Sequence, residues 1–163
     1  MTEPERSSGA VVTSYDDAMR AALVEAALAL ESADVPIGAV VLDPTGEVIG
    51  RGHNVRERDG DPTGHAEMVA LRAAASAVGE WRLNGCALVV TLEPCTMCAG
   101  AVVLARLDRL VFGAYDAKAG AVGSLWDVVR DRRLNHRPEV VGGVLEAECA
   151  SLLDDFFAHQ RLG

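Results

Sequence analysis

The sequence predicts a single α/β domain in which helices cover both faces of a central sheet. Short, continuously apolar runs rich in β-branched residues alternate along the chain with Ala- and Leu-rich stretches of helical length. Such runs are typical of strands buried on both faces, and their alternation with helices predicts parallel strands in the second half of the chain. A chain of 163 residues is long enough for one domain with a full core and short for two.

The chain begins with an acidic and polar stretch, residues 1–13, which lacks the basic-then-apolar plan of a secretion signal. We expect this stretch to be a flexible leader before one folded domain at 14–163. Ser14, followed by two aspartates, can cap a first helix that runs to about Glu31.

A hairpin and a second helix follow. The runs "VPIGAVVL" (35–42) and "EVIGRGH" (47–53), joined by the turn sequence "DPTG", predict two antiparallel strands. A Pro-, Gly- and Asp-rich loop at 59–64 leads to a helix at 65–78, which Gly79 can end.

The second half continues the alternation of strand and helix. We expect strands at 87–92, 109–113 and 138–144, and helices at 95–105 and 146–161. No internal repeat, low-complexity tract or linker interrupts this order, so the sequence indicates one domain.

Composition narrows the class of protein. No apolar run approaches the ~18 residues of a membrane span, and four cysteines are too few for a disulfide scaffold. We therefore expect a cytoplasmic protein with reduced thiols and no membrane partner. The net charge of −9 argues against non-specific nucleic-acid binding. Two loop-like segments, 51–58 and 130–137, are nevertheless rich in arginine. They are either solvated surface charge or, if the substrate is RNA, lie near the mouth of the active site.

Two thiols stand at the start of an otherwise apolar helix in "TLEPCTMCAGAVVLARL" (91–107). The spacing of Cys95 and Cys98 puts both side chains on one face of the first turn, where free N–H groups and the helix dipole favour thiolate. A Cys-x-x-Cys pair alone can be a redox disulfide, half of a structural zinc site or part of a catalytic one.

A histidine at another helix start extends this pair. His65 opens the helix after the 59–64 loop, and two helices that follow adjacent strand ends can present His65, Cys95 and Cys98 to one ion. This set fits zinc and leaves the fourth tetrahedral position open, as in catalytic sites. A closed site would need Cys86 or Cys149, which we expect to pack in the core.

Glu67, two residues after His65, has two possible roles. A carboxylate in the first turn of a helix is ordinarily a partner of the helix dipole. Beside a metal that lowers the pKa of bound water toward ~7, a carboxylate kept off the metal suits proton transfer to the substrate. Because the three candidate ligands lie nearby in this prediction, we favour proton transfer as the role of Glu67.

His-x-Glu followed by Pro-Cys-x-x-Cys resembles the zinc-dependent nucleoside and nucleobase deaminases. More specifically, the chain resembles the bacterial tRNA-specific adenosine deaminases over residues 14–160, through "DVPIGAVV", "GHN", "DPTGHAE", "TLEPCTMCAGA", "FGAYDAKAGAVGS", "NHRPEV" and "ECASLLDDFF". Gly64 departs from the family, which more often has Ala before the histidine.

The resemblance implies a fold and a reaction. It implies a three-layer α/β/α sandwich around a mixed five-stranded sheet, as in cytidine deaminase, and a homodimer. The expected activity is a hydrolase reaction: zinc-dependent deamination of the wobble adenosine in a tRNA anticodon loop to inosine, with release of ammonia. The partner would be a tRNA anticodon stem-loop.

The resemblance also assigns residues. His65, Cys95 and Cys98 would hold one Zn²⁺ per chain, with Glu67 as the catalytic proton shuttle. Three further residues would bind substrate, namely Asn54 at the flipped nucleotide and Asp116 and Phe156 at its neighbours. The residues themselves are also consistent with Asn54 as a turn residue and Phe156 as a core residue.

Two other functions remain open on the sequence alone. One is deamination of a free base or nucleotide, such as guanine, cytosine or deoxycytidylate, on the same scaffold. The other is a zinc-stabilised binding module without catalysis, against which Glu67 and the three-ligand count argue.

Overall fold

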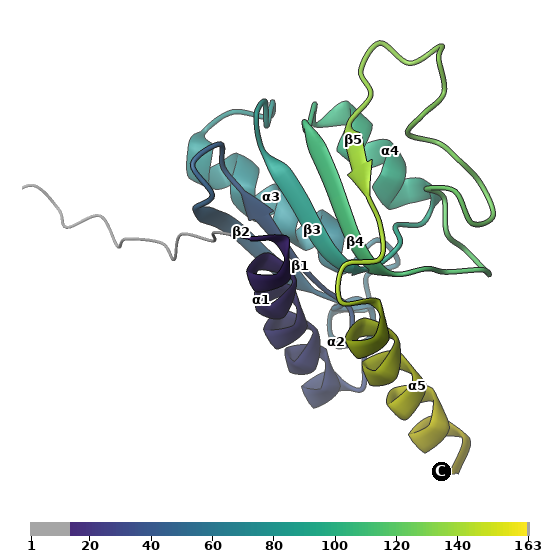
Figure 1. Ribbon diagram of the computed structural model, residues 1–163. Coiled ribbons are helices and arrows are strands. Elements are labelled where there is room, and N and C mark those ends of the chain that lie inside the picture. The colour runs from purple at the N-terminus through teal and green to yellow at the C-terminus, as the bar shows by residue number, and fades with distance from the viewer. Residues whose placement is uncertain (1–13, 163) are drawn as a thin grey trace, which may run out of the picture.

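A five-stranded mixed sheet forms the centre of the molecule (Figure 1). The computed structural model describes residues 14–162, so the expected leader at 1–13 lies outside the described residues. The strand order is β2-β1-β3-β4-β5. The strands are Gly38–Leu42 (β1), Val48–His53 (β2), Ala87–Leu92 (β3), Arg109–Ala114 (β4) and Glu139–Val141 (β5). β1 is antiparallel to both β2 and β3, whereas β3, β4 and β5 are parallel, as expected for the second half of the chain.

Helices cover both faces of this sheet, which confirms the three-layer α/β/α fold. α3 and α4 supply one buried cluster, and α1 and α5 supply a second cluster on the opposite face (Figure 1). The helices are Tyr15–Leu28 (α1), Arg56–Asp59 (α2), Ala66–Val78 (α3), Thr96–Leu104 (α4) and Glu146–Leu162 (α5). Between residues 14 and 162, no helix has the length and apolar character needed to cross a membrane.

Small residues let α3 lie directly on β2. A Cβ atom added to Gly52 would stand 2.5 Å from the carbonyl oxygen of Ala66, and one added to Gly50 would stand 2.8 Å from the backbone nitrogen of Ala74. Ala66, Ala70 and Ala74 are fully buried on the facing side of the helix. This close contact fixes the start of α3 against the sheet.

The topology brings two helix starts to one edge of the sheet. β3 and β4 run parallel, and Leu92 at the end of β3 lies opposite Ala114 at the end of β4. α4 begins shortly after β3, and α3 begins after the β2–α2 segment. Ligands of open α/β sheets bind outside the carboxyl ends of the strands. A functional site is therefore expected at this edge.

Three elements differ from the sequence expectation. The strand expected at 35–42 is Gly38–Leu42. The strand expected at 138–144 is only Glu139–Val141, because Gly143 turns the chain with φ = 83° and Gly142 lies against the ring of Phe112. The short helix α2 was not expected, since its sequence, "RERD", has no apolar residue to mark a buried face.

Candidate metal centre

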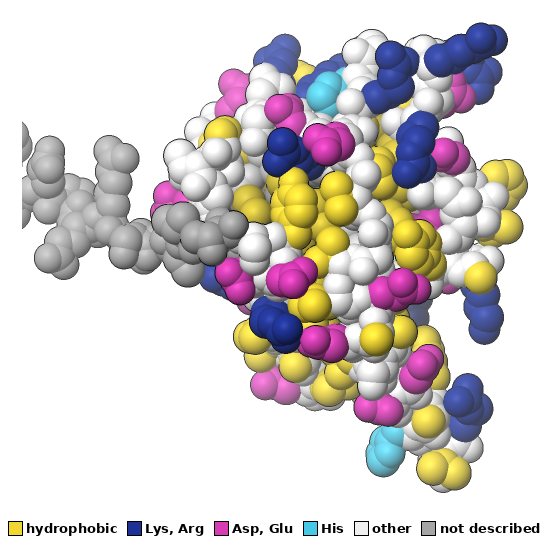
Figure 2. Space-filling model, in the orientation of Figure 1, with side chains coloured by type: hydrophobic (Ala, Val, Ile, Leu, Met, Phe, Trp, Pro, Cys, Tyr) yellow, Lys and Arg dark blue, Asp and Glu magenta, His cyan; other side chains and the backbone are white. Residues whose placement is uncertain are grey.

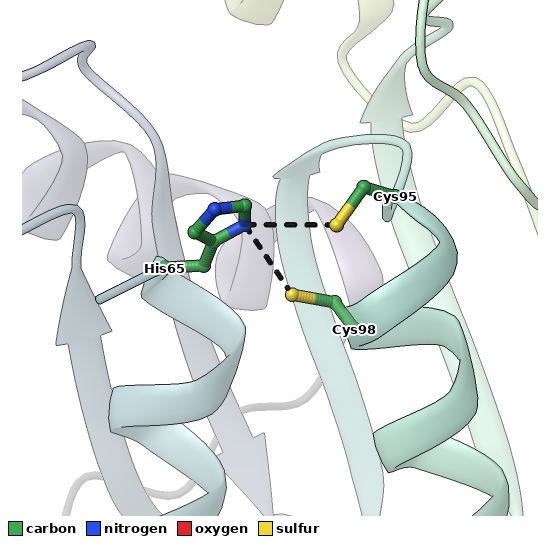
Figure 3. Close-up of side chains that lie close together, drawn as sticks. All are labelled: His65, Cys95 and Cys98. Carbon is green, nitrogen blue, oxygen red and sulfur yellow. Dashed lines mark hydrogen bonds between the residues drawn. The ribbon is translucent and has the colours of Figure 1, made fainter. Parts of the chain in front are cut away.

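Three predicted ligands converge at the carboxyl edge of the sheet (Figure 3). His65 directly precedes α3, Cys95 directly precedes α4, and Cys98 lies in the first turn of α4. The Nδ1 atom of His65 is 3.6 Å from the Sγ atom of Cys95 and 3.6 Å from the Sγ atom of Cys98. The sequence therefore predicted this grouping correctly, across 30 residues of chain.

These distances and donor types fit a tetrahedral zinc ion. Zn–S bonds of about 2.3 Å and Zn–N bonds of about 2.05 Å at tetrahedral angles place nitrogen and sulfur about 3.5 Å apart. The three ligand atoms lie within 4.8 Å of one another. A nitrogen and two sulfurs are a donor set that zinc prefers, so the residues present fit one Zn²⁺.

The other two cysteines lie away from this group. Cys86 is buried directly before β3, at the amino edge of the sheet, and Cys149 is buried in α5 against β4. Both were expected in the core, and both belong to the buried clusters. Within the described residues, the protein thus offers three ligands at this point and a fourth position open to a substrate or water.

The electrostatics favour a thiolate at Cys95. Hydrogen bonds from the Cys98 thiol and from His65 lower the pKa of Cys95 to about 3, against the opposing effect of burial. The pKa of Cys98 is raised, because it donates to Cys95 and is buried. A metal ion would replace the shared proton, and thiolate is the form that binds it.

Glu67 points inward in the first turn of α3. Its side chain is buried, with 4% of the residue exposed, and burial raises the pKa of its carboxyl group. The Cys98 thiol is close enough to hydrogen-bond with it. A buried carboxylate beside the ligands, with a pKa above its ordinary value, is suited to taking up and releasing a proton.

Asn54 lies between β2 and α2, and its side chain bonds to the start of α3. Its Oδ1 atom accepts a hydrogen bond of 3.0 Å from the backbone N–H of Ala66, while the side chain of His65, the N-cap residue, makes no capping bond. Asn54 therefore caps the start of α3 in place of His65, whose side chain is directed at the metal centre. This structural role places Asn54 beside both His65 and Glu67.

The two remaining predicted site residues are less closely tied to the ligands. Asp116 follows β4, and its carboxylate accepts hydrogen bonds from the backbone N–H groups of Lys118 and Ala119, which makes a turn. Phe156 is half-buried on α5, where its ring meets that of Phe157 edge-on at 5.3 Å. Neither belongs to the close cluster in Figure 3.

Sequence reasoning missed two buried carboxylates near the site. Asp34, 1% exposed, accepts hydrogen bonds from the backbone N–H groups of Glu57 and Arg58 and so holds α2 next to Asn54. Glu93, 2% exposed, accepts from the loop after β4. Each of these two acidic residues flanks a buried apolar run in the sequence. That position could have indicated a buried carboxylate that needs hydrogen-bond partners.

The two arginine-bearing segments lie at different edges. Arg56 follows Asn54 by two residues. The hydrogen bond with Cys95 raises the pKa of His65, and the nearby charge of Arg56 opposes this rise. Segment 130–137 instead leads to the amino end of β4, where His136 bonds to the carbonyl of Leu107. Figure 2 shows basic side chains gathered at that end of the molecule. Arg130, at the start of that segment, bonds instead to the carbonyl oxygen of Val122 in the loop after β4. Only the later part of the segment returns to the amino edge, so the expectation that both segments lie near the active-site mouth stays a prediction.

Comparison with known proteins agrees with this geometry. Residues 12–114 match the family "cytidine and deoxycytidylate deaminase zinc-binding region". The tRNA-specific adenosine deaminase of Bacillus subtilis is 50% identical over 143 residues, 88% of each chain.

Solved structures show the same fold. One, from a study of A-to-I editing by tRNA:A34 deaminases at the wobble position of transfer RNA, has a TM-score of 0.80 and 46% identity, covering 83% of this chain and 98% of the other. The guanine deaminase of Bacillus subtilis has a TM-score of 0.61 and 31% identity, covering 68% of this chain and 71% of the other. The chain therefore belongs to the cytidine and deoxycytidylate deaminase zinc-binding family, among the tRNA-specific adenosine deaminases.

Proposed function

We propose that the protein deaminates the wobble adenosine of a tRNA anticodon loop to inosine. The observation that carries the proposal is the three-ligand zinc site with a buried carboxylate, in a chain 50% identical to a tRNA-specific adenosine deaminase along 88% of its length. An unpaired loop base can reach such a site without the opening of a duplex.

Four residues carry the chemistry in this proposal. His65, Cys95 and Cys98 hold one zinc ion, which when bound lowers the pKa of a water molecule toward ~7. Glu67 lies in the first turn of α3, two residues after His65 and within hydrogen-bonding reach of Cys98. We assign the proton transfers to its carboxylate.

Glu67 acts twice in each turnover. Its carboxylate first accepts a proton from the water that adds to C6 of adenine, and gives that proton to N1. The carboxylate then takes the proton of the hydroxyl group now on C6 and passes it to the exocyclic amine, which leaves as ammonia when the bond from C6 to nitrogen breaks and the C6 carbonyl forms. Water and adenosine are consumed, and inosine and ammonia are produced. Burial suits this role, because it raises the pKa of the Glu67 carboxyl group above its ordinary value and so makes the carboxylate a stronger base.

We assign substrate binding to Asn54, Asp116 and Phe156. Asn54 lies in the connection between β2 and α2 and is held against the start of α3, so its amide can hydrogen-bond the flipped nucleotide. Asp116 stands at the end of β4, on the same sheet edge as Cys95, where it can meet a neighbouring nucleotide. Phe156 offers a half-exposed ring for stacking on a base.

We also propose that the protein works as a homodimer in the cytoplasm. Several large apolar side chains are more than half exposed and can supply a subunit interface: Trp81, Leu104, Leu125 and Trp126. A reducing compartment keeps both ligand thiols available for the metal. Sedimentation velocity at micromolar concentration tests the dimer, and a monomeric active enzyme contradicts it.

One other activity has a specific observation behind it. The similarity in fold to a guanine deaminase makes deamination of a free base the second candidate. The two candidates are separated by a parallel assay of a stem-loop with a wobble adenosine, guanine, cytosine and deoxycytidylate. We expect inosine from the stem-loop and no ammonia from the three small molecules. Turnover confined to the small molecules contradicts the tRNA proposal.

A further inference from the structure

A buried carboxylate gathers the loop that follows β4. Glu93, two residues before Cys95, is 2% exposed. Its Oε1 atom accepts hydrogen bonds from the backbone N–H of Asp116, at 3.1 Å, and from the Ser124 hydroxyl. Its Oε2 atom accepts from the backbone N–H groups of Val122, at 3.0 Å, and Ser124, at 3.1 Å. One side chain thus accepts four hydrogen bonds from one loop.

The loop is closely fitted to this carboxylate. A Cβ atom added to Gly120 would stand 2.5 Å from the Cδ and Oε2 atoms of Glu93, so only glycine fits there. The backbone N–H of Ala121 donates to the carbonyl oxygen of Pro94, at 2.8 Å, in the segment that leads to Cys95. The 116–124 loop is therefore held to the segment 93–95 by side-chain and backbone bonds together.

We propose that Glu93 is a positioning residue that sets the affinity for RNA by holding the Asp116 loop beside the zinc site. The proposal rests on the assignment of Asp116 to substrate binding made under the proposed function. Glu93 is not one of the three ligands, and it does not contact the reacting base in this scheme. Glu93 acts indirectly, by fixing the position of Asp116.

The hydrogen bonds show how an amide at this position would act. A glutamine has one oxygen and one NH₂ group, so its NH₂ must face two of the four donors. On the Oε2 side both donors are backbone N–H groups, which cannot turn. On the Oε1 side the Ser124 hydroxyl can rotate to accept, and only the N–H of Asp116 is opposed. Glu93→Gln should therefore displace Asp116 in particular.

The test compares steady-state kinetics on a wobble-adenosine stem-loop. One buried N–H that faces another donor and so loses its acceptor corresponds to a loss of about tenfold in affinity. In Glu93→Gln we expect KM to rise about tenfold, kcat to change less than about threefold, and zinc to remain at one per chain. Loss of zinc, or a fall in kcat with KM unchanged, overturns the proposal and makes Glu93 a structural support of the metal site.

Two further variants make the test specific. If Glu93 acts through Asp116, the double variant Glu93→Gln/Asp116→Ala should have no higher KM than the worse single variant, and additive effects overturn the proposal. Gly120→Ala disturbs the same contact without changing charge, and it should also raise KM at constant zinc. An unchanged KM in Gly120→Ala contradicts the proposal even if Glu93→Gln fails to fold.

A matched control and the wild type complete the design. Asp43 accepts hydrogen bonds from the backbone N–H groups of Thr45 and Glu47 in the hairpin turn, away from the zinc site, so Asp43→Asn should leave KM unchanged. A wild-type protein that is inactive on the stem-loop overturns the proposed function itself. Wild-type activity with an unaltered KM in Glu93→Gln overturns this inference alone.

Discussion

At the scale of single residues, the site depends on how helix starts are capped. His65 and Cys95 occupy the N-cap positions of α3 and α4, yet neither side chain makes a capping bond. Both are directed at a common point instead, and Asn54 bonds the N–H of Ala66 in place of His65. The ligands are thereby held by backbone that is already fixed to the sheet, which preorganises the metal site.

The first prediction concerns the metal ligands. Cys98→Ala should lower the zinc content well below one per chain, because two ligands hold the ion far less tightly than three. Cys86→Ala, a buried thiol at the other edge of the sheet, is the matched control and should keep full zinc. Atomic absorption on purified proteins measures both, and full zinc in Cys98→Ala contradicts the ligand assignment.

The second prediction concerns Glu67. Glu67→Gln keeps the size of the side chain but cannot carry protons, so kcat should fall by about 10²–10⁴ with zinc retained. Glu57→Gln, an exposed carboxylate on α2, should leave kcat unchanged. Steady-state assays at saturating stem-loop provide the comparison. A Glu67→Gln protein with normal turnover removes Glu67 from the mechanism.

At the scale of elements, glycine and alanine set the distance between helix and sheet. Gly52 on β2 lies directly against Ala66, in the first turn of α3 between His65 and Glu67. Gly38 on β1 makes the same close approach to Ala22 and Ala26 of α1. Packing of this kind transmits any displacement of a strand to the helix that it carries.

The third prediction follows from this packing. Gly52→Ala should lower the free energy of unfolding by about 1–3 kcal/mol, because the added methyl group overpacks the β2–α3 contact. Its zinc affinity should fall as well, since the start of α3 moves. Gly100→Ala on α4, where an added Cβ atom meets open space, should be neutral or slightly stabilising. Urea unfolding at one fixed zinc concentration tests both, and equal stability of the two variants contradicts the packing argument.

Much of this element-level structure was predictable from sequence. The β-branched runs marked the strands closely, and the 87–92 strand was predicted with its observed bounds. Helix starts were marked by Ser14, His65 and Cys95. The strand order and α2 depend on contacts between distant residues, which no local pattern records. The four bonds to Glu93 were hidden for the same reason, since their donors lie 23–31 residues away.

At the scale of the whole molecule, charge is distributed unevenly. The chain carries a net charge of −9, yet basic side chains gather at the amino edge of the sheet (Figure 2). Some of the basic charge is paired within the chain, since Arg133 bonds to Asp131. Arg130 bonds to Asp127 and to the carbonyl oxygen of Val122, in the loop after β4. Arg56, more than half exposed, stands on the side of the zinc site.

The fourth prediction compares the contributions of Arg56 and Arg133 to RNA binding. If Arg56 meets a phosphate of the stem-loop, Arg56→Gln should reduce the salt dependence of binding by about 0.7 in the slope of log K against log salt concentration. Arg133→Gln, at the opposite edge, should leave the slope unchanged. Binding titrations at four salt concentrations measure both slopes. A reduced slope in Arg133→Gln contradicts the prediction, because it would mean that the RNA also contacts the side of the molecule that bears Arg133.

The central claim is that one zinc site, with Glu67 beside it, deaminates an adenosine presented at the wobble position. The most direct measurement uses two anticodon stem-loops of equal length, each with a single adenosine, at the wobble position in one and at the next loop position in the other. We expect inosine in the first RNA alone, with none formed by Glu67→Gln. Equal deamination of both RNAs, or deamination of neither alongside release of ammonia from free guanine, would contradict the account.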